Sequence, residues 1–157
     1  MIFVTIGTQI PFDRLIETLD RIAPELDEEI YAQVLKGKYK PKHIKTLDFI
    51  APDEFEKVFQ QARLVVAHAG MGTILSSLYN SKPLIIFPRI AALGEHRNEH
   101  QNATAQMIKK KNYAYVATNE EELRELLHQD LRPLKSIGEF ASESLVKSVK
   151  DYIDLFV

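Results

Sequence analysis

The chain has 157 residues, of which 45% are hydrophobic, so it is long enough for the core of one domain of the usual ~100–150 residues. Its net charge of −2 gives no support for binding to nucleic acid or to an anionic membrane, and its lack of cysteine excludes disulfides, a thiol nucleophile and a cysteine-based zinc site. No run approaches ~18 apolar residues, so we expect a soluble, cytoplasmic protein that meets membranes only through a surface or a partner.

Apolar strands and amphipathic helices alternate in the first half of the chain. Strands are expected at residues 1–6, 30–35, 44–50 and 64–68. Helices are expected from Pro11 to Pro24 and from Pro52 onward, because proline suits a first helical position and apolar residues then recur at helical spacing.

The second half continues the alternation. We expect a helix from Thr73 to about Tyr79, a strand at 84–87, a polar segment at 88–102 with a helix running on to about Lys111, and a strand at 113–117. Residues 118–121 (Thr-Asn-Glu-Glu) form a capping box for another helix. A last helix from about Ser142 carries an apolar stripe, for the core or for a partner. The pattern predicts one α/β domain whose parallel sheet has helices on both faces.

Three loops follow the carboxyl ends of the expected strands and should lie at one edge of the sheet. They are residues 7–9, residues 68–73 and residues 88–101. In parallel α/β sheets, ligands bind at this edge. Asp13, at the start of the first helix, is interpreted as a helix N-terminal charge instead of a catalytic base.

The segment 65–78 is typical of a strand, a glycine turn and a helix start, which is the arrangement that holds a diphosphate. Gly70 and Gly72 allow the backbone to approach a ligand, and the helix start offers free N–H groups and the positive end of a dipole. Thr73 adds a hydroxyl, and His68 can donate to a phosphate or orient the loop. The plain alternative is an ordinary turn between a strand and a helix.

The polar segment is rich in groups that can bind sugar hydroxyls. They are Glu95, His96, Asn98, Glu99, His100 and Gln101. A carboxylate next to an amide suits such recognition, whereas the alternative is a solvated helix start. A metal site from His96 and His100, four residues apart, is disfavoured because no HExxH pattern or third ligand is evident.

Several common catalytic motifs are missing from the sequence. There is no Ser-His-Asp elbow, no Walker GxxxxGK[ST] and no GxGxxG, so hydrolase, P-loop NTPase and typical NAD-enzyme functions have little support. No Asp-x-Asp pair is present either. We therefore expect no cofactor and no metal.

Three segments together resemble the C-terminal domain of family 28 glycosyltransferases. They are Phe-Val-Thr-Ile-Gly-Thr at 3–8, His-Ala-Gly-Met-Gly-Thr at 68–73 and Glu-His-Gln-Asn-Ala at 99–103. The resemblance runs from Ile2 to about Leu127 and is strongest to the short soluble subunits of two-part enzymes that make dolichol-linked glycans or bacterial exopolysaccharide and capsule. It implies a single Rossmann-like domain over residues 1–157, with a mostly parallel sheet, as the C-terminal half of a GT-B fold.

The resemblance also implies a function. The chain would bind a UDP-sugar and, with a separate membrane-associated glycosyltransferase subunit, transfer the sugar to a lipid-linked acceptor, at the inner face of the membrane. The implied diphosphate-binding residues are Gly7, Thr8, His68, Gly70, Met71, Gly72 and Thr73. The implied ribose- and sugar-binding residues are Ser76, Glu95, Asn98, Glu99, His100 and Gln101.

Ser76 departs from the family pattern, in which a glutamate often holds the ribose at that position. A serine makes fewer hydrogen bonds than a carboxylate, so this departure slightly favours a different function, a non-catalytic nucleotide-sugar-binding or activating accessory subunit. A relative of the NDP-sugar epimerases is a further alternative, which the length disfavours because those enzymes need two domains in one chain.

Overall fold

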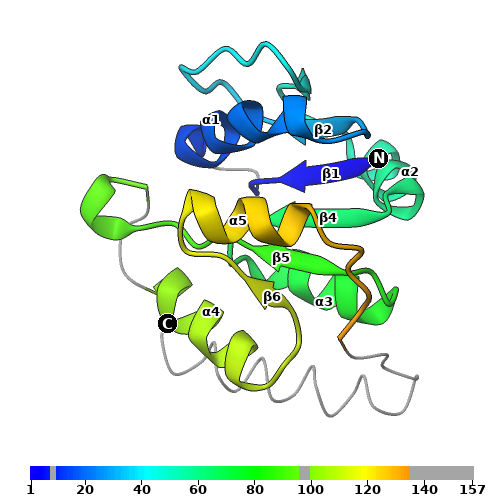
Figure 1. Ribbon diagram of the computed structural model, residues 1–157, viewed down its shortest axis with the longest axis vertical. Coiled ribbons are helices and arrows are strands. Elements are labelled where there is room, and N and C mark those ends of the chain that lie inside the picture. Colours follow the sequence, from blue (N-terminus) through cyan, green and yellow to red (C-terminus); the bar gives the residue numbers. More distant parts are fainter. Residues whose placement is uncertain (8–9, 96–99, 135–157) are drawn as a thin grey trace.

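The computed structural model describes residues 1–7, 10–95 and 100–134. Six parallel strands form one sheet in the order β3-β2-β1-β4-β5-β6 (Figure 1). The strands are β1 (Ile2–Thr5), β2 (Ile30–Gln33), β3 (Lys45–Leu47), β4 (Leu64–Ala67), β5 (Leu84–Ile86) and β6 (Tyr115–Val116). The predicted parallel α/β sheet is confirmed.

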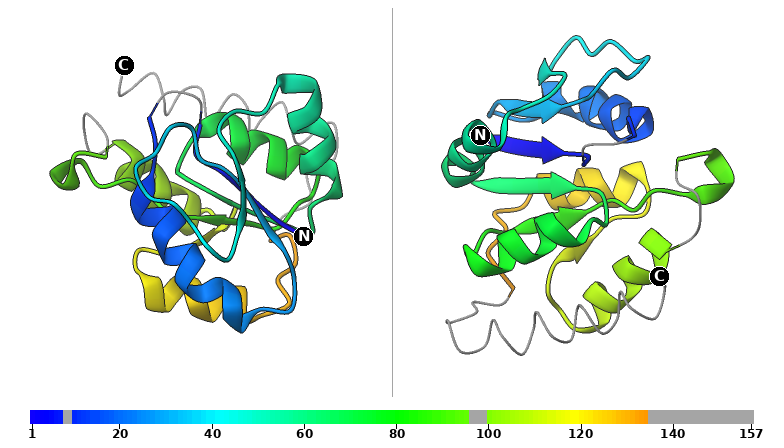
Figure 2. Two further views of the ribbon diagram at one scale, coloured as in Figure 1. Left: turned by 90° about the horizontal axis from the view of Figure 1, so that it is seen from above. Right: turned by 180° about the vertical axis from the view of Figure 1, so that it is seen from behind.

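Helices cover both faces of the sheet. On one face lie α1 (Asp13–Ile22) and α5 (Glu120–Leu127), and on the other lie α2 (Pro52–Gln61), α3 (Met71–Tyr79) and α4 (His100–Lys110), which Figure 2 shows from behind. Two short 3₁₀ turns, η1 (Ala23–Glu25) and η2 (Ala91–Leu93), complete the described elements. Side chains alternate along β1, so Ile2 and Val4 enter one apolar core while Phe3 enters the other. Among the described residues, no helix is both long and apolar enough to cross a bilayer.

Most element types follow the sequence pattern, but some boundaries differ. Helix α3 begins at Met71 and not at Thr73, because the extended backbone of Gly70 makes that residue the N-cap. The third strand covers only Lys45–Leu47 of the predicted 44–50, and all three of its residues are exposed at the edge of the sheet. Instead of the predicted capping box at 118–121, Asn119 caps the helix by accepting from the backbone N–H of Glu122, whose carboxylate accepts from the N–H and hydroxyl of Thr118. The predicted helix from Ser142 lies outside the described residues.

The strand order fixes where a ligand can approach. β1 and β4 lie at the centre of the sheet, with β2 and β3 on the side of β1 and with β5 and β6 on the side of β4. The helices that follow β1 and β4 therefore pack on opposite faces of the sheet, and the carboxyl ends of these two strands form the switch point at which parallel α/β sheets bind ligands. The loops that follow these two strands are the two glycine loops singled out in the sequence.

Candidate functional site

The imidazole of His68 lies between the two glycine loops. Gly7 has a φ of +81°, and a Cβ added there would lie 3.1 Å from His68 Nε2. A Cβ added at Gly70 would lie only 2.5 Å from the same nitrogen. Both glycines are therefore needed for the close packing of this ring, a reason that differs from the close approach of a ligand that the sequence suggested.

Gln101, from the first turn of α4, holds His68 and its loop in place. Its side chain is almost fully buried, and its Oε1 accepts hydrogen bonds from the backbone N–H of Ala69 at 3.3 Å and of Arg89 at 3.0 Å. Its Nε2 lies 2.8 Å from His68 Nδ1. Because an amide nitrogen only donates, Nδ1 accepts, and the neutral imidazole carries its proton on Nε2, beside Gly7 and Gly70.

The first turn of α3 has the features of an anion site. No side chain caps the helix, its first turn holds no acidic residue, and Gly70 leads into it with an extended backbone. A Cβ at Gly72 would meet nothing within 4 Å, so the space in front of this turn is open. The N–H groups of the first turn and the positive end of the dipole are thus available to a negatively charged group.

Arg89 ties the loop after β1 to the loop after β5. Its side chain is buried, and the guanidinium donates to four backbone carbonyls. These belong to Ile6 at 2.7 Å, Ile10 at 2.6 Å, Pro11 at 2.9 Å and Glu95 at 3.2 Å. Burial lowers the pKa of Arg89 to about 10, against the opposing effect of the Glu95 charge, so the group stays protonated at neutral pH.

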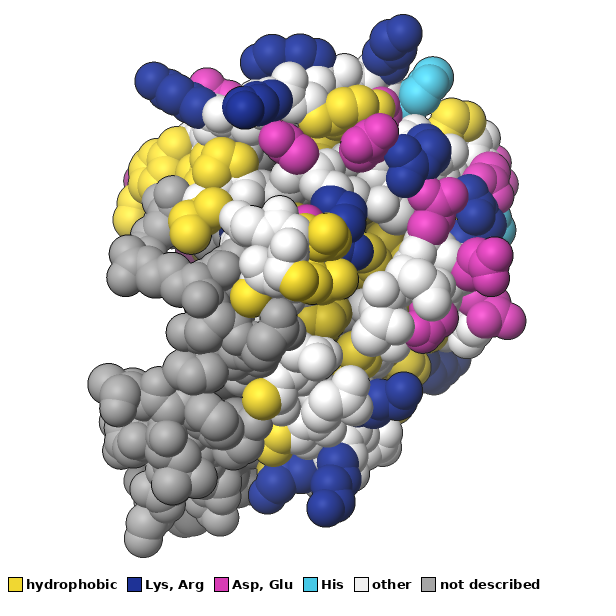
Figure 3. Space-filling model, turned by 90° about the vertical axis from the view of Figure 1, so that its left-hand side faces the viewer, with side chains coloured by type: hydrophobic (Ala, Val, Ile, Leu, Met, Phe, Trp, Pro, Cys, Tyr) yellow, Lys and Arg dark blue, Asp and Glu magenta, His cyan; other side chains and the backbone are white. Residues whose placement is uncertain are grey.

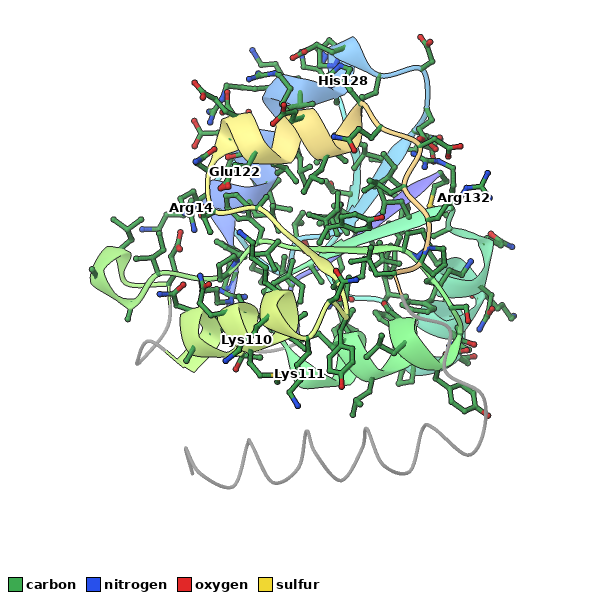
Figure 4. All side chains as sticks on the ribbon, turned by 60° about the horizontal axis from the view of Figure 1, so that its bottom comes forward. Arg14, Lys110, Lys111, Glu122, His128 and Arg132 are labelled. Carbon is green, nitrogen blue, oxygen red and sulfur yellow. The ribbon has the colours of Figure 1, made fainter. Side chains whose placement is uncertain are left out.

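Arg14 and Glu95 form a second link, which joins α1 to the loop after β5. Arg14 on α1, labelled in Figure 4, donates to Glu95 Oε2 from Nε at 2.9 Å and to Oε1 from Nη2 at 3.1 Å. The Glu95 carboxylate also accepts from the backbone N–H of Ile90 at 2.9 Å. Both carboxylate oxygens are therefore bound within the chain, and the arrangement holds the η2 loop against α1.

The remaining predicted site residues fall into two groups. Thr73 and Ser76 are half-buried on α3, one turn apart. Thr8, Asn98 and Glu99, like His96 of the alternative metal site, lie outside the described residues, as do the side chains of Met71 and His100. The structure thus brings Gly7, His68, Gly70 and Gln101 together beside the start of α3, and places Glu95 in an ion pair. Asp13 lies in the first turn of α1 and accepts hydrogen bonds from the backbone N–H groups of residues 38 and 39.

Sequence reasoning missed three residues that hold the site. They are Arg14, Gln33, whose Nε2 donates to the Gly7 carbonyl at 3.0 Å, and Arg89. Only Arg89 carried a visible signal, since it is a charged residue between the apolar strand β5 and the apolar run 90–93. All three act on distant partners, and such partners leave no spacing pattern in the sequence.

Comparison with known protein families gives one match over nearly the whole chain. The model described as "Glycosyltransferase family 28 C-terminal domain" matches residues 1–156. Among curated proteins, no sequence matches the chain significantly.

Solved structures show the same fold at low sequence identity. An NMR structure of ALG13 is 20% identical, with a TM-score of 0.60, over 92% of this chain and 93% of that one. MurG from Acinetobacter baumannii is 17% identical, with a TM-score of 0.61, over 95% of this chain but 49% of that one. The glycosyltransferase VinC, solved in complex with dTDP, is 14% identical, with a TM-score of 0.56, over 98% of this chain and 37% of that one. The fold is thus a single α/β domain that corresponds to the C-terminal half of GT-B glycosyltransferases.

Proposed function

The chain belongs to the glycosyltransferase family 28 C-terminal domain family, and from this membership we propose that it binds the nucleoside diphosphate of a UDP-sugar donor at the edge where β1 and β4 end. The observation that carries the proposal is the uncapped first turn of α3, open in front of Gly72 and without an acidic residue. The complex of VinC with dTDP supports a nucleoside diphosphate as ligand.

The diphosphate would be bound mainly by backbone groups. The N–H groups of Gly72 and Thr73 and the dipole of α3 favour its negative charge, and by resemblance we add His68 to this site. Gly7 and, by resemblance, Thr8 and Met71 line the same site. Because these donors are already in place, they also stabilise the charge that develops on the leaving phosphate, and no metal is needed for that role.

The ribose and sugar would lie toward the start of α4. By resemblance we assign this contact to Ser76, Glu95, Asn98, Glu99, His100 and Gln101. Two of these have a further role, because the carboxylate of Glu95 is bound by Arg14, and Gln101 orients His68. We therefore treat Gln101 as a positioning residue for His68.

The reaction we propose is an inverting transfer. An acceptor hydroxyl attacks the anomeric carbon of the sugar, the bond to the diphosphate breaks, and UDP leaves. The acceptor site and the base would come from a second unit, which we propose to be a separate, membrane-associated glycosyltransferase subunit that holds a lipid-linked acceptor in glycan or polysaccharide synthesis. Two findings support a second unit: the chain spans about half the length of MurG, and it matches nearly all of ALG13.

A non-catalytic role is the second candidate. Ser76 stands where relatives often have a glutamate, so this chain could be an accessory subunit that activates its partner while its own bound nucleotide sugar takes no part in the transfer. The two functions differ in one outcome. If substitutions at this site abolish donor binding but leave the activity of the whole complex unchanged, the accessory role is correct.

Gly72→Asp tests the diphosphate site. The new carboxylate enters open space, so the fold should remain, but it places a like charge where the diphosphate binds, and we expect UDP binding to fall at least about tenfold. Gln106→Asp is the matched control, because it adds the same charge on an exposed position of α4. Calorimetric titration with UDP measures both, and an unchanged affinity of Gly72→Asp would remove this turn from the site.

A transfer assay tests the need for a second unit. We expect the purified chain alone to transfer little sugar from a panel of UDP-sugars to a lipid-linked acceptor, and coexpression with its partner to restore transfer. Rapid turnover by the chain alone would contradict the two-part arrangement.

A further inference from the structure

The strongest local charge of the molecule lies in the loop between β2 and β3. Residues 36–45 hold five lysines, one histidine and no acidic residue. The remaining residues, with 15 Lys and Arg against 22 Asp and Glu, carry a net charge of −7. Figure 3 views the edge where the strands end, and it shows Lys and Arg side chains gathered along the top, where Figure 1 places this loop. The overall charge of −2 therefore conceals a strongly basic segment.

Two carboxylates of α1 hold the backbone of this loop. Asp13 accepts hydrogen bonds from the N–H groups of Lys38 at 3.1 Å and Tyr39 at 3.3 Å, and Gly37 packs so closely on Asp13 that a Cβ there would clash with the carboxylate. Asp20 accepts from the Tyr39 hydroxyl at 2.6 Å and from the backbone N–H groups of residues 42 and 43 at 3.1 Å and 2.7 Å. The loop is thus a fixed platform.

The lysine side chains of the platform are left to solvent. Lys36, Lys38, Lys40 and Lys42 are exposed, and within the described parts of the chain none of them forms an ion pair. Lys45, on the edge strand β3, pairs with Glu29 at 2.9 Å. A lysine on an edge strand is a common protection against aggregation, but that explanation applies only to Lys45, because the other four lie in the loop.

Large apolar side chains are exposed next to the lysines. Leu47 is 43% exposed and Phe49 is 54% exposed. Both follow directly on the platform, which is joined to them by hydrogen bonds from the N–H of Val34 to the Leu47 carbonyl at 2.9 Å and from the N–H of Leu35 to the Asp48 carbonyl at 2.7 Å. Figure 3 shows hydrophobic side chains beside the basic ones on the same upper part of the molecule.

We propose that the platform and its apolar neighbours, residues 36–49, form a docking surface for an anionic phospholipid bilayer. Unpaired lysines are attracted to acidic headgroups, and an exposed phenylalanine beside them enters the interface between headgroups and chains. The loop begins at the carboxyl end of β2, and residues 48 and 49 follow the carboxyl end of β3, so docking would hold this edge of the sheet toward the membrane. This contact is made by the chain itself, and it does not depend on the proposed donor or partner.

Binding of the full chain to vesicles tests the surface. The probes are vesicles of phosphatidylcholine mixed with phosphatidylserine and vesicles of phosphatidylcholine alone, in a flotation assay without nucleotide. We expect binding only to the mixed vesicles, weakened by added salt, and at least about tenfold weaker for the combined variant Lys36→Gln, Lys38→Gln, Lys40→Gln, Lys42→Gln.

A second combined variant controls for total charge. Lys57, Lys109, Lys110 and Lys111 are also exposed, and Figure 4 shows Lys110 and Lys111 at the end of α4, on the opposite face of the sheet from Arg14. Changing these four to Gln removes the same charge, and we expect less than about threefold loss. Equal losses in both variants, or a wild-type chain that ignores the mixed vesicles, overturn the proposal, even if the platform then proves to bind an acidic protein.

The apolar part of the surface has its own test. Phe49→Ser removes an exposed side chain, so the fold should stay intact, as thermal melting would verify for all variants. We expect it to lower the vesicle binding that persists at raised salt by about threefold or more. Unchanged binding of Phe49→Ser at raised salt overturns the insertion of Phe49 into the bilayer interface and, with it, the docking surface as proposed.

Discussion

Two groups of loops in this molecule are held by charged side chains, but in opposite directions. At the edge proposed to bind the nucleotide, the cation Arg89 is buried and donates to backbone carbonyls of the loop after β1. In the basic platform, the anions Asp13 and Asp20 accept from backbone N–H groups. The positive charge of Arg89 is thus bound inside the fold, whereas the positive charges of the platform lysines stay on the surface.

The difference shows how the same chain makes two kinds of surface. Arg89 and Gln101 form hydrogen bonds to the backbone of the loops at this edge. The fold therefore does not need the N–H groups of the first turn of α3 as hydrogen-bond donors. The platform is satisfied from α1, so its lysines are not needed for the fold either. In both places, buried polar groups bind the loop backbone, so a different set of donors is left for the proposed ligand: backbone amides at the first turn of α3 and ammonium groups in the platform.

Among the substitutions that test this comparison, Arg89→Met should lower the stability of the protein most. Methionine keeps an apolar chain of similar length, but leaves four backbone carbonyls without their donor, and we expect a loss of about 3 kcal/mol or more of unfolding free energy. The loop after β1 should loosen, and UDP binding should weaken with it. Urea denaturation and calorimetry measure the two effects.

Arg132→Met is the control for this change. Arg132 is exposed and its replacement removes the same charge, so this variant should stay within about 0.5 kcal/mol of the wild type. If the two variants are equally stable, Arg89 does not hold the edge as the structure indicates.

Gln101→Met should have an intermediate effect. It removes the acceptor for the backbone N–H groups of Ala69 and Arg89, which costs about 1–3 kcal/mol when buried groups stay unpaired. It also removes the hydrogen bond from Gln101 to His68 Nδ1, so the NMR signals that report the imidazole tautomer should change. If Gln101 only filled space in the core, its replacement would not change these signals. Gln106→Met, on the exposed side of the same helix, should change neither stability nor tautomer. An unaltered His68 spectrum in Gln101→Met would contradict the positioning role.

Asp20→Asn should have the smallest effect, and one that depends on pH. Burial by itself would raise the pKa of Asp20, but hydrogen bonds from Tyr39 and the backbone of residues 42 and 43 outweigh it and hold the pKa below its ordinary value of 3.8. A carboxyl with a lowered pKa in the fold contributes stability above its unfolded pKa, and that contribution is lost as the pH falls through the folded one. We expect a loss of about 1–2 kcal/mol at neutral pH, which shrinks at acidic pH below 3.8.

Asp27→Asn controls for the charge change, since Asp27 is exposed. Urea denaturation at neutral and acidic pH compares the two variants. A difference between them that stays constant with pH would mean that the ionised carboxylate does not anchor the platform.

The sequence alone predicted a large part of the fold. The apolar run of β4 (Leu64–Ala67) and the helical spacing of Leu15, Ile16, Leu19 and Ile22 in α1 are local signals, and both elements formed as predicted. The family match confirms the resemblance, and the ligand site at the glycine turn after β4 stays a prediction. Periodicity and turn chemistry act over a few residues, so they can be read from neighbours in the chain.

Only the tertiary structure decided which polar groups serve the fold and which face outward. Arg89 binds a carbonyl 83 positions away, and Glu95 pairs with Arg14 across 81 positions, so no local pattern reveals either contact. The same holds for the platform, where Asp13 and Asp20 are bound by a loop about 25 residues further along the chain. Burial of a charge requires partners of fitting geometry, and folding alone brings them together. Composition therefore fixed the number of charges, and the fold determined where they act.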